Sequence, residues 1–257
     1  MTAAAEDTFL AGKTALVTGG SRNLGATIAE QLAAHGASVA ITFHTGADTA
    51  AALVETLERE TGRPHHAFGG DLASSDDVRE VVGAAQQALG DVDILVNNAG
   101  PFSMTPFTEL PEAEWDRIWN SNVKAAYIAS QLVAPAMRAS GFGRIVNVSA
   151  VSYSLRNHSI YGLAKSALIF LTEELSVELG PEITVNAVAP GQILESADDI
   201  AEFDPTFVER AVAATPIGRL VTRREVADVV VDLCRPERGA LTGVTVPLDG
   251  GFRLRRF

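Results

Sequence analysis

Short apolar runs alternate with amphipathic stretches along almost the whole chain, and no other feature constrains the fold as strongly. The runs cover residues 14–19, 37–43, 92–100, 143–149, 183–191 and 243–251. Between them, stretches such as 24–36, 76–89 and 123–137 carry apolar residues at helical spacing. Short buried runs separated by amphipathic helices are typical of a parallel sheet that is covered by helices on both faces. The sequence therefore predicts an α/β fold on a doubly wound parallel sheet.

The domain organisation follows from length and from the lack of a linker. The chain has 257 residues, and α/β folds of this size usually form one domain around one core. No repeat or segment rich in Pro, Gly or Ser divides the sequence, so we expect a single domain over 1–257. The least regular stretch, 192–217, is expected to form short helices on a mobile connection and is a candidate substrate lid.

Composition excludes several classes of partner. The net charge is −12, which disfavours binding to nucleic acid or to an anionic membrane. No segment is long and apolar enough to span a bilayer, and the N-terminal residues resemble neither a secretory signal nor an anchor. Cys234 is the only cysteine, so an internal disulfide is excluded and a buried thiol is expected. These features favour a cytoplasmic protein.

A glycine-containing turn joins the first apolar run to the first amphipathic stretch. Residues 18–25 read Thr-Gly-Gly-Ser-Arg-Asn-Leu-Gly. Such a turn brings backbone N–H groups and a helix N-terminus close to a pyrophosphate. Glycine also simply permits tight turns, but the strand before the turn and the helix after it favour a dinucleotide site. The expected cofactor contacts in this turn are Gly19, Ser21, Arg22, Asn23 and Leu24.

Four motifs together resemble the short-chain dehydrogenase/reductase family, including its 3-oxoacyl-carrier-protein reductases and other ketoreductases. They are Thr-Gly-x-x-x-Asn-x-Gly at 18–25, Asn-Asn-Ala-Gly at 97–100, Tyr-x-x-x-Lys at 161–165 and Asn-x-Val-x-Pro-Gly at 186–191. The resemblance covers nearly the whole chain. It implies a Rossmann-type sheet of about seven strands, a nicotinamide cofactor and hydride transfer at a carbonyl or alcohol carbon. It also implies a homo-oligomer, either a tetramer or a dimer.

The resemblance assigns further cofactor contacts. Asn98, Ala99 and Gly100 match the segment that passes the adenosine side, although Asn97 and Asn98 could equally brace neighbouring strands. Asp71, followed by Leu72, matches the acid that contacts adenine; a helix cap is the alternative role. Pro190, Gly191 and Ile193 match the turn whose backbone meets the nicotinamide carboxamide.

The choice of cofactor depends on the end of the second apolar run. Members of the family that prefer NAD place a carboxylate there, which binds the adenosine ribose and repels a 2′-phosphate. Here His44 and Thr45 follow the run, and the next acid is Asp48. Arg22 lies where NADP-preferring members carry a cation, although it could be a solvated surface residue. We therefore expect NADP(H), with His44 as a further phosphate contact. Asn23 replaces the family's usual glycine but tolerates left-handed backbone angles.

Tyr161 and Lys165 are expected on one face of a helix because they are four residues apart. A nearby ammonium favours the phenolate form of tyrosine and so tunes it for proton transfer. In the family, the tyrosine gives a proton to the carbonyl oxygen and the lysine also holds the nicotinamide ribose, so Tyr161 and Lys165 are expected cofactor contacts as well. Asn122 matches the asparagine that positions water behind the lysine; its alternative role is a helix N-cap.

The family's carbonyl-polarising serine has no exact match. Counting forward from Arg144 reaches Ala150, and counting back from Tyr161 reaches Val148, because the loop between them is about two residues short of the family's. The two counts straddle Ser149, which we place first as a catalytic residue if the strand end shifts register. Ser152 is the next candidate, and the absence of any serine is the third possibility.

The sequence thus predicts an NADP(H)-dependent reductase of a ketone or β-ketoacyl group, with a small-molecule carbonyl substrate. Its pocket walls are expected to include Pro101, Phe102, Ser103, Arg156, His158 and lid residues from 194 to 214. Two alternatives remain. Asn23 and His44 suggest a pteridine reductase, which the lack of Asp at 149 or 150 opposes. The displaced serine suggests an NADP(H)-binding protein with little catalysis.

Three other features have simple interpretations. His65 and His66 lack the spacing of a metal site and are expected on the solvated surface, so no metal is expected. Trp115 and Trp119 lie four apart on a helical stretch and are expected to serve packing. The basic end at 253–257 is either a subunit contact or a frayed tail.

Overall fold

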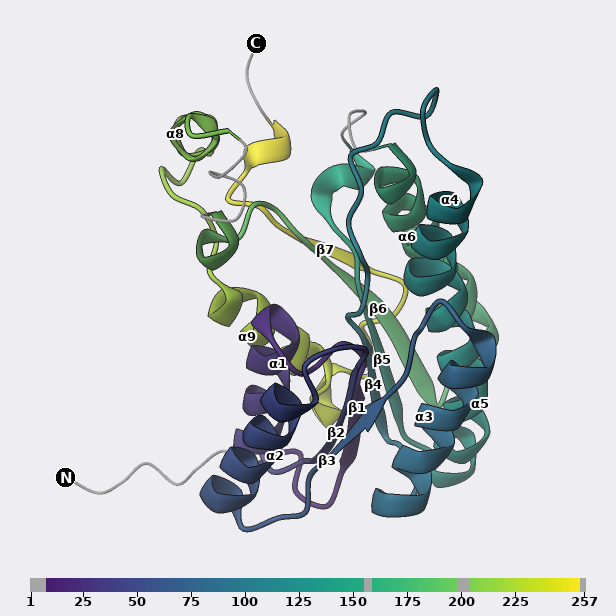
Figure 1. Cartoon of the computed structure of the whole chain (residues 1–257). Coiled ribbons are helices and arrows are strands. Elements are labelled where there is room, and N and C mark those ends of the chain that lie inside the picture. The colour runs from purple at the N-terminus through teal and green to yellow at the C-terminus, as the bar shows by residue number, and fades with distance from the viewer. Residues whose placement is uncertain (1–7, 155–158, 198–203, 255–257) are drawn as a thin grey trace, which may run out of the picture.

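The computed structural model describes residues 8–154, 159–197 and 204–254, and its centre is a seven-stranded parallel sheet (Figure 1). The strands are β1 (Thr14–Val17), β2 (Ser38–Phe43), β3 (His66–Gly69), β4 (Ile94–Asn97), β5 (Gly143–Val148), β6 (Ile183–Pro190) and β7 (Thr245–Leu248). Their order is β3-β2-β1-β4-β5-β6-β7, and every pair is parallel. The predicted doubly wound sheet is confirmed.

Helices cover both faces of this sheet (Figure 1). One face carries α1 (Asn23–Ala34), α2 (Ala47–Thr61) and α9 (Arg223–Leu233). The other carries α3 (Ser75–Leu89), α4 (Glu112–Trp119), α5 (Ala125–Ser140) and α6 (Ser159–Leu179). A π-helical segment, Asn120–Lys124, joins α4 to α5. Short helices at Leu194–Ser196 and in α8 (Phe207–Ala213) occupy the described parts of the expected lid, as its sequence predicts. Residues 198–203 of that stretch lie outside the described residues.

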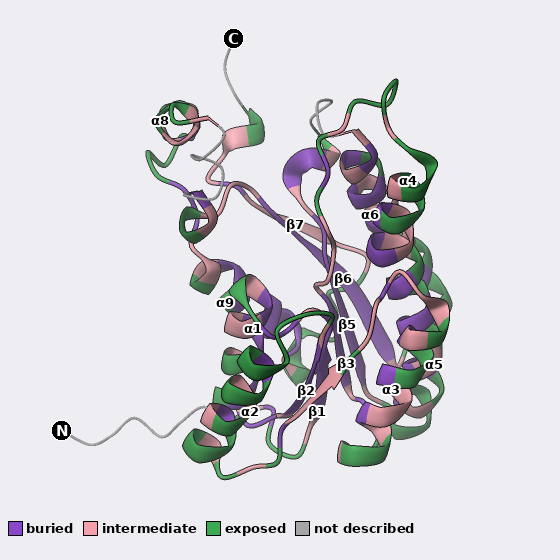
Figure 2. Cartoon of the chain, viewed as in Figure 1, coloured by how far each residue is buried: buried purple, intermediate pink, exposed green. Residues whose placement is uncertain are grey.

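The hydrophobic core has two layers, one on each face of the sheet. Leu16 of β1 lies in the layer with α3 and α5, whereas its neighbour Val17 lies in the layer with α1 and α9. Successive side chains of a strand point to opposite faces, so a fully buried strand must be apolar at every position. Figure 2 shows the buried strands in the middle of the molecule and the exposed outer faces of the helices. This explains why β1 and β4 read as continuous apolar runs.

The strand order places a crevice above the carboxyl ends of β1 and β4. From β1 the chain proceeds outward to β2 and β3, then returns to β4 and proceeds the other way. The helices that follow β1 and β4 therefore diverge, and ligands of open α/β sheets bind at such a switch point. The glycine turn after β1 and the Asn-Asn-Ala-Gly segment after β4 meet there.

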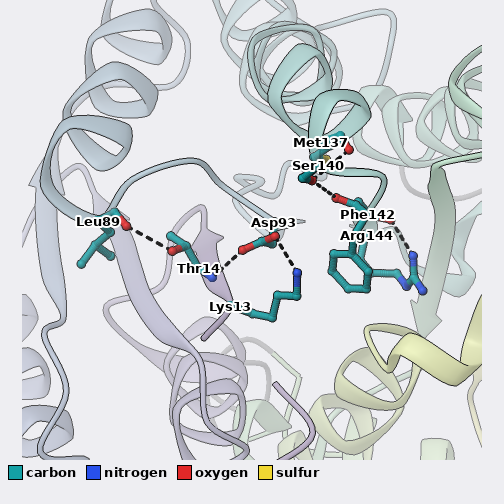
Figure 3. A network of polar contacts seen from close by, with 9 residues as sticks. Lys13, Thr14, Leu89, Asp93, Met137, Ser140, Phe142 and Arg144 are labelled. Carbon is teal, nitrogen blue, oxygen red and sulfur yellow. Dashed lines mark hydrogen bonds and ion pairs between the residues drawn. The ribbon is translucent and has the colours of Figure 1, made fainter. Parts of the chain in front are cut away.

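A polar network lies at the amino-terminal ends of the central strands, at the end of the sheet opposite the crevice (Figure 3). The Asp93 carboxylate accepts hydrogen bonds from Lys13 Nζ at 2.9 Å and from the Thr14 amide at 3.0 Å. The Phe142 ring lies 4.0 Å from Lys13 Nζ and 4.3 Å from the Arg144 guanidinium carbon, measured to the ring centroid. Buried Arg144 donates to the carbonyls of Gly143, Arg235 and Pro236. These contacts tie β1, β4 and β5 together at the amino-terminal end.

His65 contradicts the expectation of a solvated pair. Its exposed fraction is 0%, whereas His66 is half-buried. The Val39 amide donates to His65 Nδ1 at 3.0 Å, and His65 Nε2 lies 2.9 Å from Thr61 Oγ1, whose own proton goes to the Leu57 carbonyl. The ring is therefore neutral, with its proton on Nε2. This role could not be predicted, because two adjacent histidines interrupt the apolar pattern at the start of the short edge strand β3.

We expect His65 to make the protein sensitive to mild acid. Burial lowers the pKa of His65 to about 4 from an ordinary value of 6.5. The native state therefore binds fewer protons than the unfolded state between these values, so stability falls as the pH falls through that window. The loss from pH 7 to pH 5 should be about 2 kcal/mol. Urea unfolding at both pH values would measure it.

The matched variants are His65→Gln and His66→Gln. Glutamine at 65 cannot titrate, so the dependence on pH should become shallower by that amount, whereas the change at His66 should leave it intact. Equal dependence in all three proteins would contradict the assignment.

Cys234 is fully buried, as expected, and its thiol donates to the Val230 carbonyl. The expectation that the two tryptophans serve packing holds for Trp119, which packs against a small core cluster that includes Ile118 and Ile160. Trp115 is exposed and stacks on Trp119 with ring centroids 6.4 Å apart. Within the described residues, no helix is long and apolar enough to cross a membrane.

Candidate active site

The turn after β1 is held by the segment after β4. Thr18 Oγ1 accepts hydrogen bonds from the amides of Asn98 and Ala99, and Asn98 Nδ2 donates to the carbonyls of Thr18 and Gly19. A Cβ atom at Gly25 would lie 2.2 Å from the Gly19 carbonyl oxygen, so only glycine fits there. Asn98 therefore braces the turn. In the same way Asn97 braces two strands, because its Nδ2 donates to Asn147 Oδ1 of β5 at 2.8 Å.

Asn23 adopts a φ of +52°, in the left-handed region. Glycine would hold this conformation at least cost, and asparagine is among the side chains that best tolerate it. The structure therefore confirms that the turn survives the replacement, and α1 begins directly at this residue.

A cleft of about 440 Å³ opens between this turn and the ends of β2 and β4. It brings together most residues that the sequence assigns to the cofactor, namely Gly19, Ser21, Arg22, Asn23, Leu24, His44, Asp71, Leu72, Asn98, Ala99 and Gly100. Arg117 of α4 and Ser121 of the π-helical segment also line it. Neither residue was predicted from the sequence, since nothing in a helical pattern shows which turn will face a cleft.

Asp71 lies in the cleft but does not cap a helix. Its amide donates to Asp77 Oδ2 at 2.8 Å, and its own Oδ1 accepts from the Ala73 amide at 2.9 Å. The N-cap of α3 is Ser74, whose hydroxyl accepts from the Asp77 amide. The alternative role considered for Asp71 is therefore taken by Ser74, and the carboxylate stays at the cleft wall.

Tyr161 and Lys165 both lie on α6, as their spacing predicts. Lys165 Nζ donates to the Val148 carbonyl at the end of β5 at 2.9 Å, and it lies 5.6 Å from the centroid of the Tyr161 ring. Burial raises the pKa of Tyr161 to about 12 and lowers the pKa of Lys165 to about 8. This differs from the expectation that the ammonium lowers the tyrosine pKa: in the protein alone, desolvation is the larger effect, and the phenol keeps its proton at neutral pH.

Gly100 joins the cleft to this pair. A Cβ atom at Gly100 would lie 2.2 Å from Asn122 Oδ1 and 2.8 Å from Lys165 Nζ. Gly100 also lines the cleft, so the cleft, the lysine and the asparagine meet at one point. The structure therefore places the two predicted sites next to each other.

Asn122 is not a helix N-cap. It lies inside the π-helical segment, where its Nδ2 donates to the carbonyls of Ile118 and Pro101. Its Oδ1 is buried and has no hydrogen-bond partner. An unpaired buried oxygen is costly, and one beside a lysine at a cleft wall is a natural acceptor for water.

The two candidate serines differ in their partners. Ser149 Oγ is buried and donates to the Lys165 carbonyl at 2.8 Å, which disfavours it as a donor to a substrate. Ser152 lies in a single helical turn, Val151–Tyr153, that packs against α6. Its Oγ is buried and has no hydrogen-bond partner. Its hydroxyl proton is therefore uncommitted, whereas that of Ser149 is used within the protein.

The remaining predicted residues lie outside the cleft. Pro190 ends β6, the Gly191 amide donates to the Leu248 carbonyl, and Ile193 forms an isolated bridge with Val221. These three do not line the described cleft. Phe102 is 52% exposed, and its ring meets that of Tyr161 edge-on with centroids 4.7 Å apart.

Of Ser103, Arg156 and His158, which the sequence also assigns to the pocket, only Ser103 lies among the described residues. Ser103 is buried and donates to the Glu114 carboxylate, so its hydroxyl serves the loop rather than a pocket. Arg156 and His158 lie outside the described residues. In the part of the chain that is described, no group of three or more His, Cys, Asp or Glu side chains is placed to hold a metal ion.

Comparison with known proteins decides the family. A family model described as enoyl-(acyl carrier protein) reductase matches residues 19–253. A tropinone reductase homolog of Arabidopsis thaliana is 36% identical over 96% of this chain and 95% of its own. A 3-oxoacyl-[acyl-carrier-protein] reductase of Staphylococcus epidermidis is 33% identical over 93% of this chain and 98% of its own. The chain belongs to the short-chain dehydrogenase/reductase family. It is therefore an oxidoreductase of a family that works on carbonyl and alcohol groups of small molecules with nicotinamide cofactors.

A solved structure supports the same fold. The crystal structure of a blue fluorescent protein from a metagenomic library, in complex with NADPH, is 37% identical and covers 95% of this chain and 98% of its own, with a TM-score of 0.84. The described residues of the present chain fit a dinucleotide: a glycine turn that tolerates no side chain at Gly25, a cleft with three basic side chains, and an unpaired buried oxygen where the cleft meets Lys165.

Proposed function

We propose that this short-chain dehydrogenase/reductase uses NADPH to reduce a ketone or a β-ketoacyl thioester to an alcohol. The observation that supports the proposal is that Gly100, which lines the cleft, lies directly against the side chains of Lys165 and Asn122. The names of the relatives support carbonyl reduction, and the description of the family model favours an acyl-type substrate.

Residues of the chain can supply the proton that the substrate's carbonyl oxygen takes up during reduction. Because burial holds the pKa of Tyr161 near 12, the phenol is protonated at neutral pH and is ready to donate to a carbonyl oxygen. Lys165, anchored on the Val148 carbonyl, holds a positive charge close to the ring as the phenolate forms. Asn122 Oδ1 offers an acceptor for a water molecule that returns a proton through Lys165. When bound, the nicotinamide supplies the hydride.

The preference for NADP(H) rests on charge at the end of β2. His44 and Thr45 follow the strand and line the cleft, and Arg22 lies opposite, at the N-terminus of α1. The first acid after β2 is Asp48, already within α2. A carboxylate that would repel a 2′-phosphate is therefore lacking directly after β2, while two basic side chains that favour the phosphate are present.

We further propose Ser152 as the donor to the substrate carbonyl. Ser152→Ala should lower kcat about 100-fold, as loss of one oxyanion donor typically does, without lowering stability, since its hydroxyl has no partner. Ser149→Ala should instead cost about 1 kcal/mol of stability by removing the bond to the Lys165 carbonyl. Steady-state kinetics and urea unfolding of both variants would measure this. If Ser149→Ala lost the larger share of kcat, or neither changed it, the assignment of Ser152 would be wrong.

The test of the function is oxidation of NADPH and NADH by the purified protein against a panel of ketones. The panel holds acetoacetyl thioesters, cyclic and aromatic ketones, and biopterin, which tests a pteridine reductase. Turnover with NADPH that exceeds turnover with NADH supports the proposal. Tight NADPH binding with no turnover across the panel would favour a binding role.

We propose that the protein is a homo-oligomer and that α6 forms part of its interface. Leu163, Phe170 and Val177 are exposed and recur every seven residues along α6, which makes one apolar stripe. Exposed stripes of this kind mark association surfaces. Light scattering after size-exclusion chromatography should give a dimer or tetramer, and Phe170→Glu should shift the mass downward; a monomeric parent protein would refute the proposal.

A further inference from the structure

Arg117 and Ser121 form a wall of the cleft that no sequence motif assigns. Both residues line the cleft, and they lie four residues apart on the helical path from α4 into the π-helical segment. Side chains at this spacing lie on one helix face, one above the other. Because α4 covers the face of the sheet opposite α1 (Figure 1), the cleft has the glycine turn on one side and this wall on the other.

Arg117 has no structural partner that would explain its place. Its side chain is exposed, and within the described ranges it forms no ion pair or hydrogen bond. Glu114, the acid about one turn earlier on α4, instead accepts hydrogen bonds from the hydroxyls of Ser103 and Thr105. The guanidinium is therefore free to meet a ligand in the cleft.

Ser121 also has an unused polar group. Its exposed fraction is only 7%, and its hydroxyl makes no hydrogen bond to another described residue. A hydroxyl that is largely withdrawn from water gains free energy when a partner is supplied. Since Ser121 lines the cleft, a bound ligand can be that partner.

The chemistry around this wall suits a purine base. A guanidinium is flat and stacks on aromatic faces. Leu72 lines the same cleft and adds an apolar surface, and Asp71 beside it keeps carboxylate Oδ2 for a ligand, because Oδ1 accepts from the Ala73 amide. Adenine has aromatic faces and an amino group at its edge, which matches this set. Phosphates, by contrast, suit the N–H groups of the glycine turn on the other side of the cleft.

We propose that Arg117 and Ser121 bind the adenosine of the cofactor, with the Arg117 guanidinium stacked on the adenine face and the Ser121 hydroxyl hydrogen-bonded to the adenosine. This inference rests on the proposed use of a nicotinamide dinucleotide in the cleft and deepens it. It gives α4 and the π-helical segment two tasks, because the residue after Ser121 is Asn122, whose Oδ1 faces Gly100 beside Lys165.

The experiment is isothermal titration calorimetry of the full chain with adenosine 2′,5′-bisphosphate and with 5′-AMP. These ligands carry no nicotinamide, so the readout does not depend on catalysis, and they share one base but differ in the 2′-phosphate. The variants are Arg117→Gln, Arg117→Lys and Ser121→Ala. Arg79→Gln is the matched control, since Arg79 is an exposed residue of α3 that does not line the cleft.

Arg117→Gln should weaken the binding of both ligands about tenfold, the size of a partly desolvated cation–π contact. Arg117→Lys should weaken it equally, because an ammonium keeps the charge but offers no flat surface. Ser121→Ala should weaken both ligands about threefold through the lost hydrogen bond, and Arg79→Gln should match the parent protein.

Different results would overturn the proposal. A loss confined to the bisphosphate would place Arg117 at the 2′-phosphate, and affinity restored in Arg117→Lys would reduce its role to charge. Parent-like affinity in Arg117→Gln or in Ser121→Ala would remove that residue from the site. Failure of the proposed function looks different: a parent protein that binds neither ligand nor NADPH does not use the cleft for a cofactor, and equal affinity for both ligands would contradict only the preference for NADP(H).

Discussion

Replacing Tyr161 with phenylalanine should lower kcat for ketone reduction about 1000-fold, within the range that general acids contribute. The hydroxyl is the only part removed, and the edge-on contact between the ring and Phe102 remains. The cleft proposed for the cofactor is lined by other residues, so NADPH binding should change little. Stopped-flow or steady-state assays with the best ketone of the panel, together with fluorescence titration of NADPH, would separate the two effects.

Tyr127→Phe is the matched control. Tyr127 lies exposed on α5, far along the chain from Tyr161, and its hydroxyl accepts a hydrogen bond from the Gln131 side chain. The same chemical change there should leave kcat within about twofold, since surface substitutions change stability by less than about 0.5 kcal/mol. Activity that survives Tyr161→Phe would remove the tyrosine from the chemistry and favour the rival in which the protein chiefly binds NADP(H).

The architecture was predictable because its cause is local. A strand buried on both faces must be apolar at every residue, so β1, β4 and β5 could be read from the sequence alone. The glycine turn was predictable for a similar reason, since no side chain fits at Gly25. The edge strand β3 is half-buried and only four residues long, so it leaves no such pattern and is not among the apolar runs of the sequence.

The polar details were not predictable because they depend on which distant groups meet. Ser149 lies at the end of β5, yet its proton goes to a carbonyl of α6. His65 lies in a polar dipeptide, yet it is buried, and its two ring nitrogens form hydrogen bonds with residues of β2 and α2. Asn122 resembles an N-cap in sequence, yet it lies inside a continuous helical path. A hydrogen-bond partner in another element of the fold leaves no periodic signal in the sequence.

A side chain at position 100 should strongly reduce catalytic efficiency, because Gly100 lies between the cleft and the side chains of Asn122 and Lys165. Gly100→Ala should lower kcat/KM at least about 100-fold, because displacements of about 1 Å near reacting groups have effects of this size. The added Cβ would lie 2.2 Å from Asn122 Oδ1 and 2.8 Å from Lys165 Nζ, so one of these groups must move. Displacing Asn122 breaks its bonds to Ile118 and Pro101, and displacing Lys165 breaks its bond to Val148.

Gly83→Ala in α3 provides the control, since a Cβ there meets nothing within 4 Å. That change should leave kcat/KM unaltered and raise stability by about 0.5–1 kcal/mol, as alanine is the better helix former. Thermal unfolding, NADPH titration and steady-state kinetics on both variants would distinguish a local rearrangement from general damage. A fully active Gly100→Ala variant would show that the cleft and the Tyr161–Lys165 pair do not depend on this close approach, and the site as described here would have to be abandoned.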